Sequence, residues 1–365
     1  MVGQAIPPVI ASEQAGGRRF VSRVRTGMWA AWPGLLVAAL VAAAATGLGR
    51  LVPIIGGPVF AIVLGALTAA ALGAGGADRG QRLEGGVRFA GGAVLQLSVV
   101  VLGTGLSLRQ VLHTGASSLP VMLGTLAVAL LGAALIGRLL GLSTQVKTLI
   151  GVGTGICGAS AIAAVTAVIG AAEAEVAYAI ATIFTFNVAA VLLYPALGHV
   201  LGLSQHAFGL WAGTAINDTS SVVAAATVYG SAAASSGVVV KLTRSLMIIP
   251  ICVVLGAWSG RAARSVDQSG VARGALPWRR AFPLFLLGFL LASTLETLRV
   301  IPASWHAGLV TTSTLLITVA LAGLGLGTRP TALRAAGPRP LLLGAALWAS
   351  VGITSLLLQG ATGSL

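Results

Sequence analysis

The feature that most constrains this chain is its series of long apolar runs, each long enough for one membrane crossing. A helix needs about 20 mainly apolar residues to span the hydrocarbon core of a bilayer. The connections between the runs are short, so we expect an all-α polytopic membrane protein with a cytoplasmic tail at 1–27 and one transmembrane domain at 28–360. The eleven expected spans lie at residues 28–48, 53–74, 86–107, 116–137, 148–170, 174–198, 206–229, 236–259, 281–298, 305–327 and 338–359.

Composition supports lipid as the solvent of this chain. Charged residues make up 8% of it, against about 25% in soluble domains, which is too few for a water-facing surface. The 50 glycines suit membrane helices, because small residues let backbones approach closely. A net charge of +14 would suggest nucleic acid in a soluble protein. Here the cations lie in short loops between apolar runs, so we expect a lipid bilayer and no nucleic acid as partner.

The distribution of Lys and Arg over the loops predicts an orientation. If the N-terminus is cytoplasmic and every run crosses, the cytoplasmic side receives seventeen basic residues and the outer side four. Cytoplasmic loops of membrane proteins carry such an excess. We therefore expect a protein of the inner or plasma membrane with a cytoplasmic N-terminus and an external C-terminus.

A repeat at an offset of 220 residues is a second organising signal. A Gly-x-Gly-Leu helix end, an arginine and a proline-bearing helix recur in copies near residues 95–137 and 315–357. Seven predicted crossings separate the copies, an odd number, so they would point in opposite directions. Inverted repeats are typical of secondary transporters, whose two halves exchange conformations. Chance matching of abundant Gly and Leu is the alternative.

The first motif of the central region, residues 148–260, is the glycine-rich stretch Gly151–Ser160. Each glycine costs about 1 kcal/mol relative to alanine inside a helix, so its four glycines favour a break. A broken helix inside a membrane presents backbone N–H groups and a positive dipole end, which are ligands for an anion. A small-residue packing face without a break is the alternative. The candidate ligands are Gly153, Thr154, Gly155, Gly158 and Ser160.

The second motif places five consecutive polar residues inside an apolar run. An ionised carboxylate at a helix centre costs about 3 kcal/mol, so such groups normally face a bundle interior or a wet cavity. Asp218 is expected to bind a coupling cation, carry a proton or pair with a basic residue; a structural ion pair without a transport role is the alternative. The candidate residues are Asn217, Asp218, Thr219, Ser220 and Ser221.

The third motif is a pair of cations on one face of the following run. Lys241 lies about one turn from the expected outer boundary, where snorkelling explains it as well as function does. Arg244 lies deeper, and a cation inside a membrane protein must find a carboxylate, backbone carbonyls or an anionic substrate. We take Asp218 and an anion as the candidate partners of Arg244.

Several kinds of chemistry have no support in the sequence. There is no phosphate-binding loop, nucleophile elbow or dinucleotide fingerprint, and the four histidines are scattered. Cys157 and Cys252 have no Cys-x-x-Cys partner, so they are interpreted as buried thiols. We therefore expect no enzyme activity, no cofactor and no metal site.

Four stretches give the sequence a family resemblance. It resembles the YeiH family of bacterial inner-membrane proteins, commonly labelled sulfate exporters, over roughly residues 30–360. The resemblance implies a secondary-transporter fold with inverted repeats, broadly like bile-acid symporter or sodium/proton antiporter folds. The stretches are GVGTGICGASAIAAV at 151–165, GLWAGTAINDTSSVVAAA at 209–226, VKLTRSLMIIPI at 240–251 and LAGLGLGTRPTALRAAGPRPLLLG at 321–344.

The chain also departs from that family pattern. Some members of the family carry His-Glu at the positions of Asn217 and Asp218, and Gln at the position of Ser221. The absence of the imidazole weakens a proton relay through this pair, while the carboxylate is retained.

Together these signals predict a secondary transporter of a small anion, with sulfate or a related sulfur oxyanion or sulfonate implied by the resemblance. The site is expected near the midplane, where Gly151–Ser160 faces Asn217–Ser221, with Lys241 and Arg244 supplying positive charge. Asp218 would tune that charge or bind a coupling ion. The alternatives are a sodium or proton exchanger or symporter using Asp218, a channel, a membrane enzyme and a non-transport membrane protein. A homo-oligomer stays open.

Overall fold

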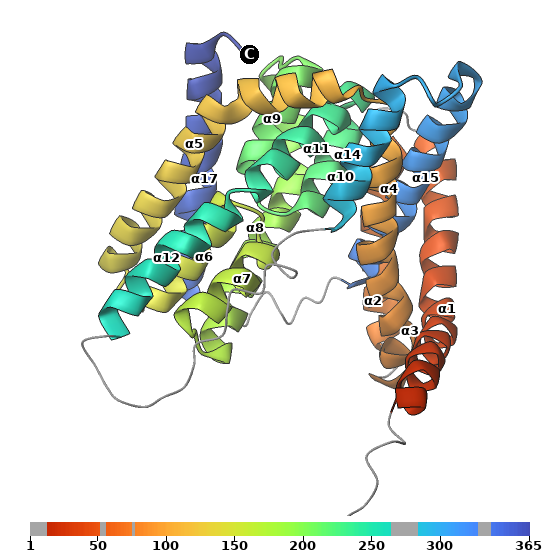
Figure 1. The fold of residues 1–365 in the computed structure, drawn as a ribbon, viewed down its shortest axis with the longest axis horizontal. Helices are drawn as coiled ribbons and strands as arrows, with labels where there is room; N and C mark the ends of the chain where they lie inside the picture. Colours follow the sequence, from red (N-terminus) through yellow and green to blue (C-terminus); the bar gives the residue numbers. More distant parts are fainter. Residues whose placement is uncertain (1–12, 52–55, 75–76, 264–283, 328–336) are drawn as a thin grey trace, which may run out of the picture.

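The computed structural model describes residues 13–51, 56–74, 77–263, 284–327 and 337–365, and these residues form helices and no strands (Figure 1). The first twelve residues of the expected tail, and Arg329 of the second repeat copy, lie outside the described part. The helices are α1 (Glu13–Leu51), α2 (Gly56–Ala74), α3 (Ala77–Phe89), the π-helix η1 (Ala90–Val94), α4 (Leu95–Gly103), α5 (Leu108–Leu139), α6 (Thr144–Gly155), α7 (Ala159–Ile169), α8 (Glu173–Val200), α9 (Gln205–Ala215), α10 (Thr219–Tyr229), α11 (Ser231–Ser245), α12 (Ile248–Ala263), α14 (Leu284–Thr297), α15 (Ala303–Gly327) and α17 (Pro338–Thr362).

The predicted multi-pass helical architecture is confirmed in its outline. By length and composition, seven segments of the described chain can cross a membrane. They are Trp32–Leu51, Leu83–Gly103, Leu108–Leu139, Glu173–Val200, Ser231–Leu255, Ala303–Gly327 and Pro338–Thr362. Shorter apolar segments, Phe60–Leu72 and Phe285–Thr297, stand where two further spans were expected. The apolar part of α1 begins at Trp32, although the helix itself extends back to Glu13.

Local sequence sets several helix ends. The hydroxyls of Ser107, Ser143 and Ser204 accept hydrogen bonds from backbone N–H groups in the first turns of α5, α6 and α9. Such caps satisfy N–H groups that have no partner inside the helix. After α5 and α8, Gly141 and Gly202 adopt φ values of 67° and 65°, a left-handed conformation that glycine takes without steric cost.

The run expected at 148–170 turns back on itself instead of crossing. Helix α6 ends at Gly155, and α7 leads away from the break at Ala159. Ser143, which caps the start of α6, donates a hydrogen bond of 2.7 Å to Glu175 in the first turn of α8, shortly after α7 ends. The entry and exit of this segment therefore lie at the same end of the bundle, the lower end in Figure 1.

The run expected at 206–229 forms a second hairpin from the opposite end. Tyr229, the last residue of α10, donates its hydroxyl to the carbonyl of Leu203, just before α9, at 2.5 Å. The side chain of Gln205 accepts from the N–H of Ala232 at 3.0 Å. These contacts lie at the upper end in Figure 1, across the 28-residue helix α8 from the first hairpin.

The expectation that both of these runs cross the bilayer is therefore wrong. Their arms have 11 or 12 residues, about 17 Å of helix each, which is near half of a hydrocarbon core of about 30 Å. The chain reverses where glycine or polar residues interrupt the helix. We call α6–α7 hairpin 1 and α9–α10 hairpin 2.

The helices fall into two groups that face each other (Figure 1). The hairpin group contains α5 to α12 and α17, and the flanking group contains α1 to α4, α14 and α15. Aromatic packing fixes hairpin 2 inside its group. Trp211 of α9 stacks on Tyr194 of α8 with ring centroids 4.2 Å apart, and its indole N–H donates to Gly352 of α17 at 3.0 Å.

Candidate functional site

The tips of the two hairpins meet inside the bundle. A Cβ atom built on Gly158, at the tip of hairpin 1, would lie 3.5 Å from the carbonyl oxygen of Asn217, at the tip of hairpin 2. The backbone N–H of Asn217 donates to the Asn187 side chain of α8 at 3.2 Å. The structure thus brings together the two central segments that the sequence singled out.

Lys241 of α11 joins the two tips from one side. Its ammonium group donates to the carbonyl of Ile156 at 2.9 Å and to that of Ile216 at 2.7 Å. Both carbonyls lie where the first arm of a hairpin ends, and the lysine side chain is completely buried. The last carbonyls of a helix lack partners within it and carry the negative end of its dipole. The lysine charge therefore compensates two helix ends at once.

Arg244 repeats this arrangement one turn further along α11. Its Nη2 donates to the carbonyl of Thr154 at 2.9 Å, and its Nη1 donates to the carbonyl of Thr214. The side chain is also fully buried. Within the described structure it forms no salt bridge, so neither Asp218 nor a free anion is its partner. Both cations bind the carbonyl ends, and neither lines the cavity beside the tips.

The two tips are copies of one short motif, a signal that the search at an offset of 220 missed. Both hairpins contain Gly-Thr-x-Ile-x-x-x-Ser, and the two copies lie 60 residues apart. Lys241 binds the equivalent isoleucine carbonyls, and Arg244 binds the equivalent threonine carbonyls. An alignment of the two interrupted runs against each other would have found it. The matched pairs are Gly153 and Gly213, Thr154 and Thr214, Ile156 and Ile216, and Ser160 and Ser220.

The second arms differ at one decisive position. Asp218 caps the N-terminus of α10, and its Oδ2 accepts from the N–H of Ser220 at 3.0 Å, from the N–H of Ser221 at 3.3 Å and from the Ser220 hydroxyl. The equivalent residue of hairpin 1 is Gly158, which gives α7 no side-chain cap. Ala159 and Ser160, which follow it, are exposed. One helix N-terminus therefore carries a carboxylate and its counterpart is open.

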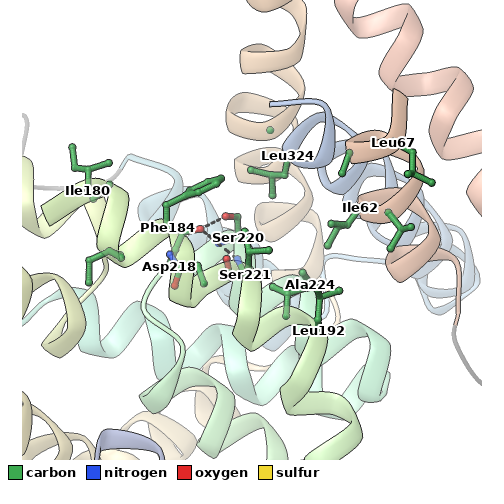
Figure 2. A pocket seen from close by; sticks show the side chains of 18 residues that line it. Ile62, Leu67, Ile180, Phe184, Leu192, Asp218, Ser220, Ser221, Ala224 and Leu324 are labelled. Carbon is green, nitrogen blue, oxygen red and sulfur yellow. Dashed lines mark hydrogen bonds between the residues drawn. The ribbon is translucent and has the colours of Figure 1, made fainter. Parts of the chain in front are cut away.

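A cavity of about 550 Å³ lies beside the second arms, between the two helix groups (Figure 2). Helices α7, α8 and α10 form one wall, and α2, η1 and α15 form the other. Its polar lining consists of Asn187, Asp218, Ser220 and Ser221, and the rest is apolar or glycine. Ala159 brings the open N-terminus of α7 to the same space.

The predicted glycines of α6 serve packing. Added Cβ atoms at Gly153 and Gly155 would come within 3.0 Å of the Ile162 side chain and 2.9 Å of the Leu126 side chain, respectively. Thr154 is buried and enters the site through its carbonyl oxygen. The break thus begins after Gly155, and close packing explains the glycines before it. Thr219 opens α10 outside the cavity lining.

Other reactive groups do not gather at this site. Cys157, at the tip of hairpin 1, and Cys252 are buried free thiols. Among the residues whose positions are described, no three His, Cys, Asp or Glu side chains form a group that could hold a metal ion. What the arrangement offers a ligand is a helix N-terminus, two serines, one carboxylate and an apolar wall.

Comparison with known proteins places the chain in a family. The family described as "Conserved hypothetical protein 698" matches residues 33–344. UPF0324 membrane protein spyM18_1033 of Streptococcus pyogenes serotype M18 is 43% identical over 334 residues, which cover 90% of this chain and 96% of that protein. UPF0324 membrane protein spr0034 of Streptococcus pneumoniae strain R6 is 42% identical over 333 residues, covering 89% and 96%.

UPF0324 membrane protein SAG1125 of Streptococcus agalactiae serotype V is 40% identical over 342 residues, which cover 91% of this chain and 98% of that protein. No solved structure matches the chain. These relatives are named as membrane proteins, in agreement with the multi-pass helical fold. The chain belongs to the UPF0324 family of membrane proteins, which corresponds to the YeiH family that its central motifs resemble.

Proposed function

We propose that this protein is a secondary transporter that moves a small anion by alternating access and catalyses no reaction. The observation that carries the proposal is the meeting of two hairpins, inserted from opposite ends, beside a cavity between two helix groups. Interrupted helices cost backbone hydrogen bonds in lipid, and membrane proteins tolerate them where they line a cavity. Substrate sites of secondary transporters are built from such helices near the midplane.

The open N-terminus of α7 supports an anionic substrate. Helix N-termini bind anions through free N–H groups and the positive end of the dipole. The structure contains its own example, because Asp218 places a carboxylate on the equivalent N–H groups of α10. By the 60-residue repeat, the corresponding donors in hairpin 1 are the N–H and hydroxyl of Ser160 and the N–H of Ala161. There the substrate would supply the negative group that Gly158 lacks.

Asp218 supports coupling of the anion to a cation. Within the described chain it is the acidic residue that lines the cavity, and a second negative charge beside it is repelled in a low dielectric. A sodium ion or proton that neutralises the carboxylate would offset that repulsion. The same carboxylate keeps a cation exchanger without an anion as the second candidate, in which flux would depend on sodium or pH alone.

The arrangement of the copies supports exchange between inward-facing and outward-facing states. The hairpins enter from opposite ends, and α5 and α17, from the two copies of the 220-residue repeat, run antiparallel in Figure 1. Since both runs that turn back do so, the charge sorting over the loops is unchanged. We therefore keep a cytoplasmic N-terminus, an external C-terminus and an inner or plasma membrane location, with sulfate or a sulfonate as substrate.

A charge placed at the open N-terminus tests the anion site. Ala159 is exposed in the cavity, so Ala159→Asp should supply an internal anion without disturbing packing. We expect uptake of labelled sulfate or sulfonate into proteoliposomes to fall at least tenfold in Ala159→Asp and to survive in Ala159→Asn, which has nearly the same shape without the charge. Equal uptake by both variants would remove the α7 N-terminus from the site. Absence of any anion uptake by the unmodified protein would reject the function.

A further inference from the structure

We infer that the transported anion carries an apolar body, which makes it an organic anion such as an alkyl- or arylsulfonate in preference to inorganic sulfate. The inference rests on the proposed function and names the substrate class of the same cavity. Its basis is the uneven distribution of polar groups over the cavity wall (Figure 2).

Polar side chains occupy one part of this wall. Of the 18 residues that line the cavity, four have polar side chains, and three of these stand at the N-terminal end of α10. Those three are Asp218, Ser220 and Ser221. The side chains on the far wall, from α2 and α15, include Ile62, Leu67 and Leu324. The cavity therefore has a polar end and an apolar remainder.

This distribution suits one class of ligand better than another. Inorganic sulfate presents oxygen on every side, and a polar surface buried without hydrogen bonds loses about 2–7 kcal/mol of solvation per group. The wall formed by α2, α15 and the side chains of Ile180, Phe184 and Leu192 offers no side-chain hydrogen-bond donor. An anion with a hydrocarbon body would place its charged group at the helix N-termini and its hydrocarbon against this wall.

The size of the cavity agrees with an organic ligand. Its volume of about 550 Å³ falls within the range of about 300–1,000 Å³ that is typical of sites for organic molecules. Such sites are mainly apolar, with a few polar groups that fix the orientation of the ligand. The same lining would leave most of the space around a sulfate ion without a partner.

A homologous series of ligands tests the inference. The dissociation constants of sulfate, methanesulfonate, butanesulfonate and hexanesulfonate are measured by calorimetry on the purified full-length protein, and each is tested as a competitor of sulfonate uptake in proteoliposomes. Burial of one methylene contributes about 0.8 kcal/mol, so the affinity should rise about fourfold per added carbon. Sulfate should bind at least tenfold more weakly than butanesulfonate.

A matched pair of variants locates the effect. Leu67 lies on the apolar wall with 61% of its surface exposed, and Leu135 of α5 is 65% exposed away from the cavity. Leu67→Ser should reduce the gain per carbon, whereas Leu135→Ser should leave it unchanged. Equal affinities for all chain lengths, or equal effects of the two variants, would overturn the inference while the transport function stands. Failure of every anion to bind or be transported would reject the function itself.

Discussion

Replacement of Lys241 by methionine tests whether one buried cation holds the two hairpin tips together. The variant retains a long unbranched side chain but leaves the carbonyls of Ile156 and Ile216 without their donor. A buried acceptor without a partner costs about 1–3 kcal/mol, so two of them cost about 2–6 kcal/mol. Removal of a buried charge gives back part of its desolvation cost, and we expect a net loss of about 2–4 kcal/mol.

Two measurements on Lys241→Met check this value. Unfolding in mixed micelles gives the change in stability relative to Leu242→Met, a buried neighbour whose volume-conserving exchange should cost less than about 1.5 kcal/mol. The native thiol of Cys157 lies at the tip of hairpin 1 with 5% of its surface exposed. We expect a maleimide to label Cys157 faster in Lys241→Met than in Leu242→Met.

The reasoning would be refuted by a Lys241→Met protein that is as stable as Leu242→Met and leaves Cys157 protected. That result would mean that the two carbonyls find other donors, and that the dipole ends of α6 and α9 need no cation. Loss of stability without labelling would also contradict the view that the lysine acts at the tips.

Three further predictions concern the hairpins. In the double variant Ser143→Cys and Glu175→Cys an oxidant should form a disulfide, because these side chains are in contact at 2.7 Å; a crossing run would separate them by about 30 Å, and failure to cross-link would contradict the hairpin. Asp218→Asn should abolish any dependence of anion uptake on sodium or pH, since the carboxylate charge is gone; an unchanged dependence would assign coupling elsewhere. Gly158→Ala should lower stability in denaturant titration by about 1–3 kcal/mol, because its φ is 68°, whereas Gly47→Ala, in open space within α1, should be neutral or stabilising.

Much of the fold could be predicted because membrane insertion depends on local properties. Apolar runs such as Leu108–Leu139 and Pro338–Thr362 are visible in the sequence, and their helices follow from the need to satisfy backbone groups in lipid. The two interruptions were also predictable, since the glycines before Ser160 and the polar residues from Asn217 are unfavourable in a continuous apolar helix. A shared motif 60 residues apart was present but was not recognised.

The sequence alone determined that this chain lives in a bilayer as a bundle of helices and where two of its apolar runs break. Only the tertiary structure decided that those runs reverse, because the evidence is a contact between distant residues such as Ser143 and Glu175. It also decided that Lys241 and Arg244 face carbonyls instead of the cavity. The physical reason is that hydrophobicity acts through each segment separately, whereas the partner of a buried charge depends on which helix ends the whole fold brings beside it.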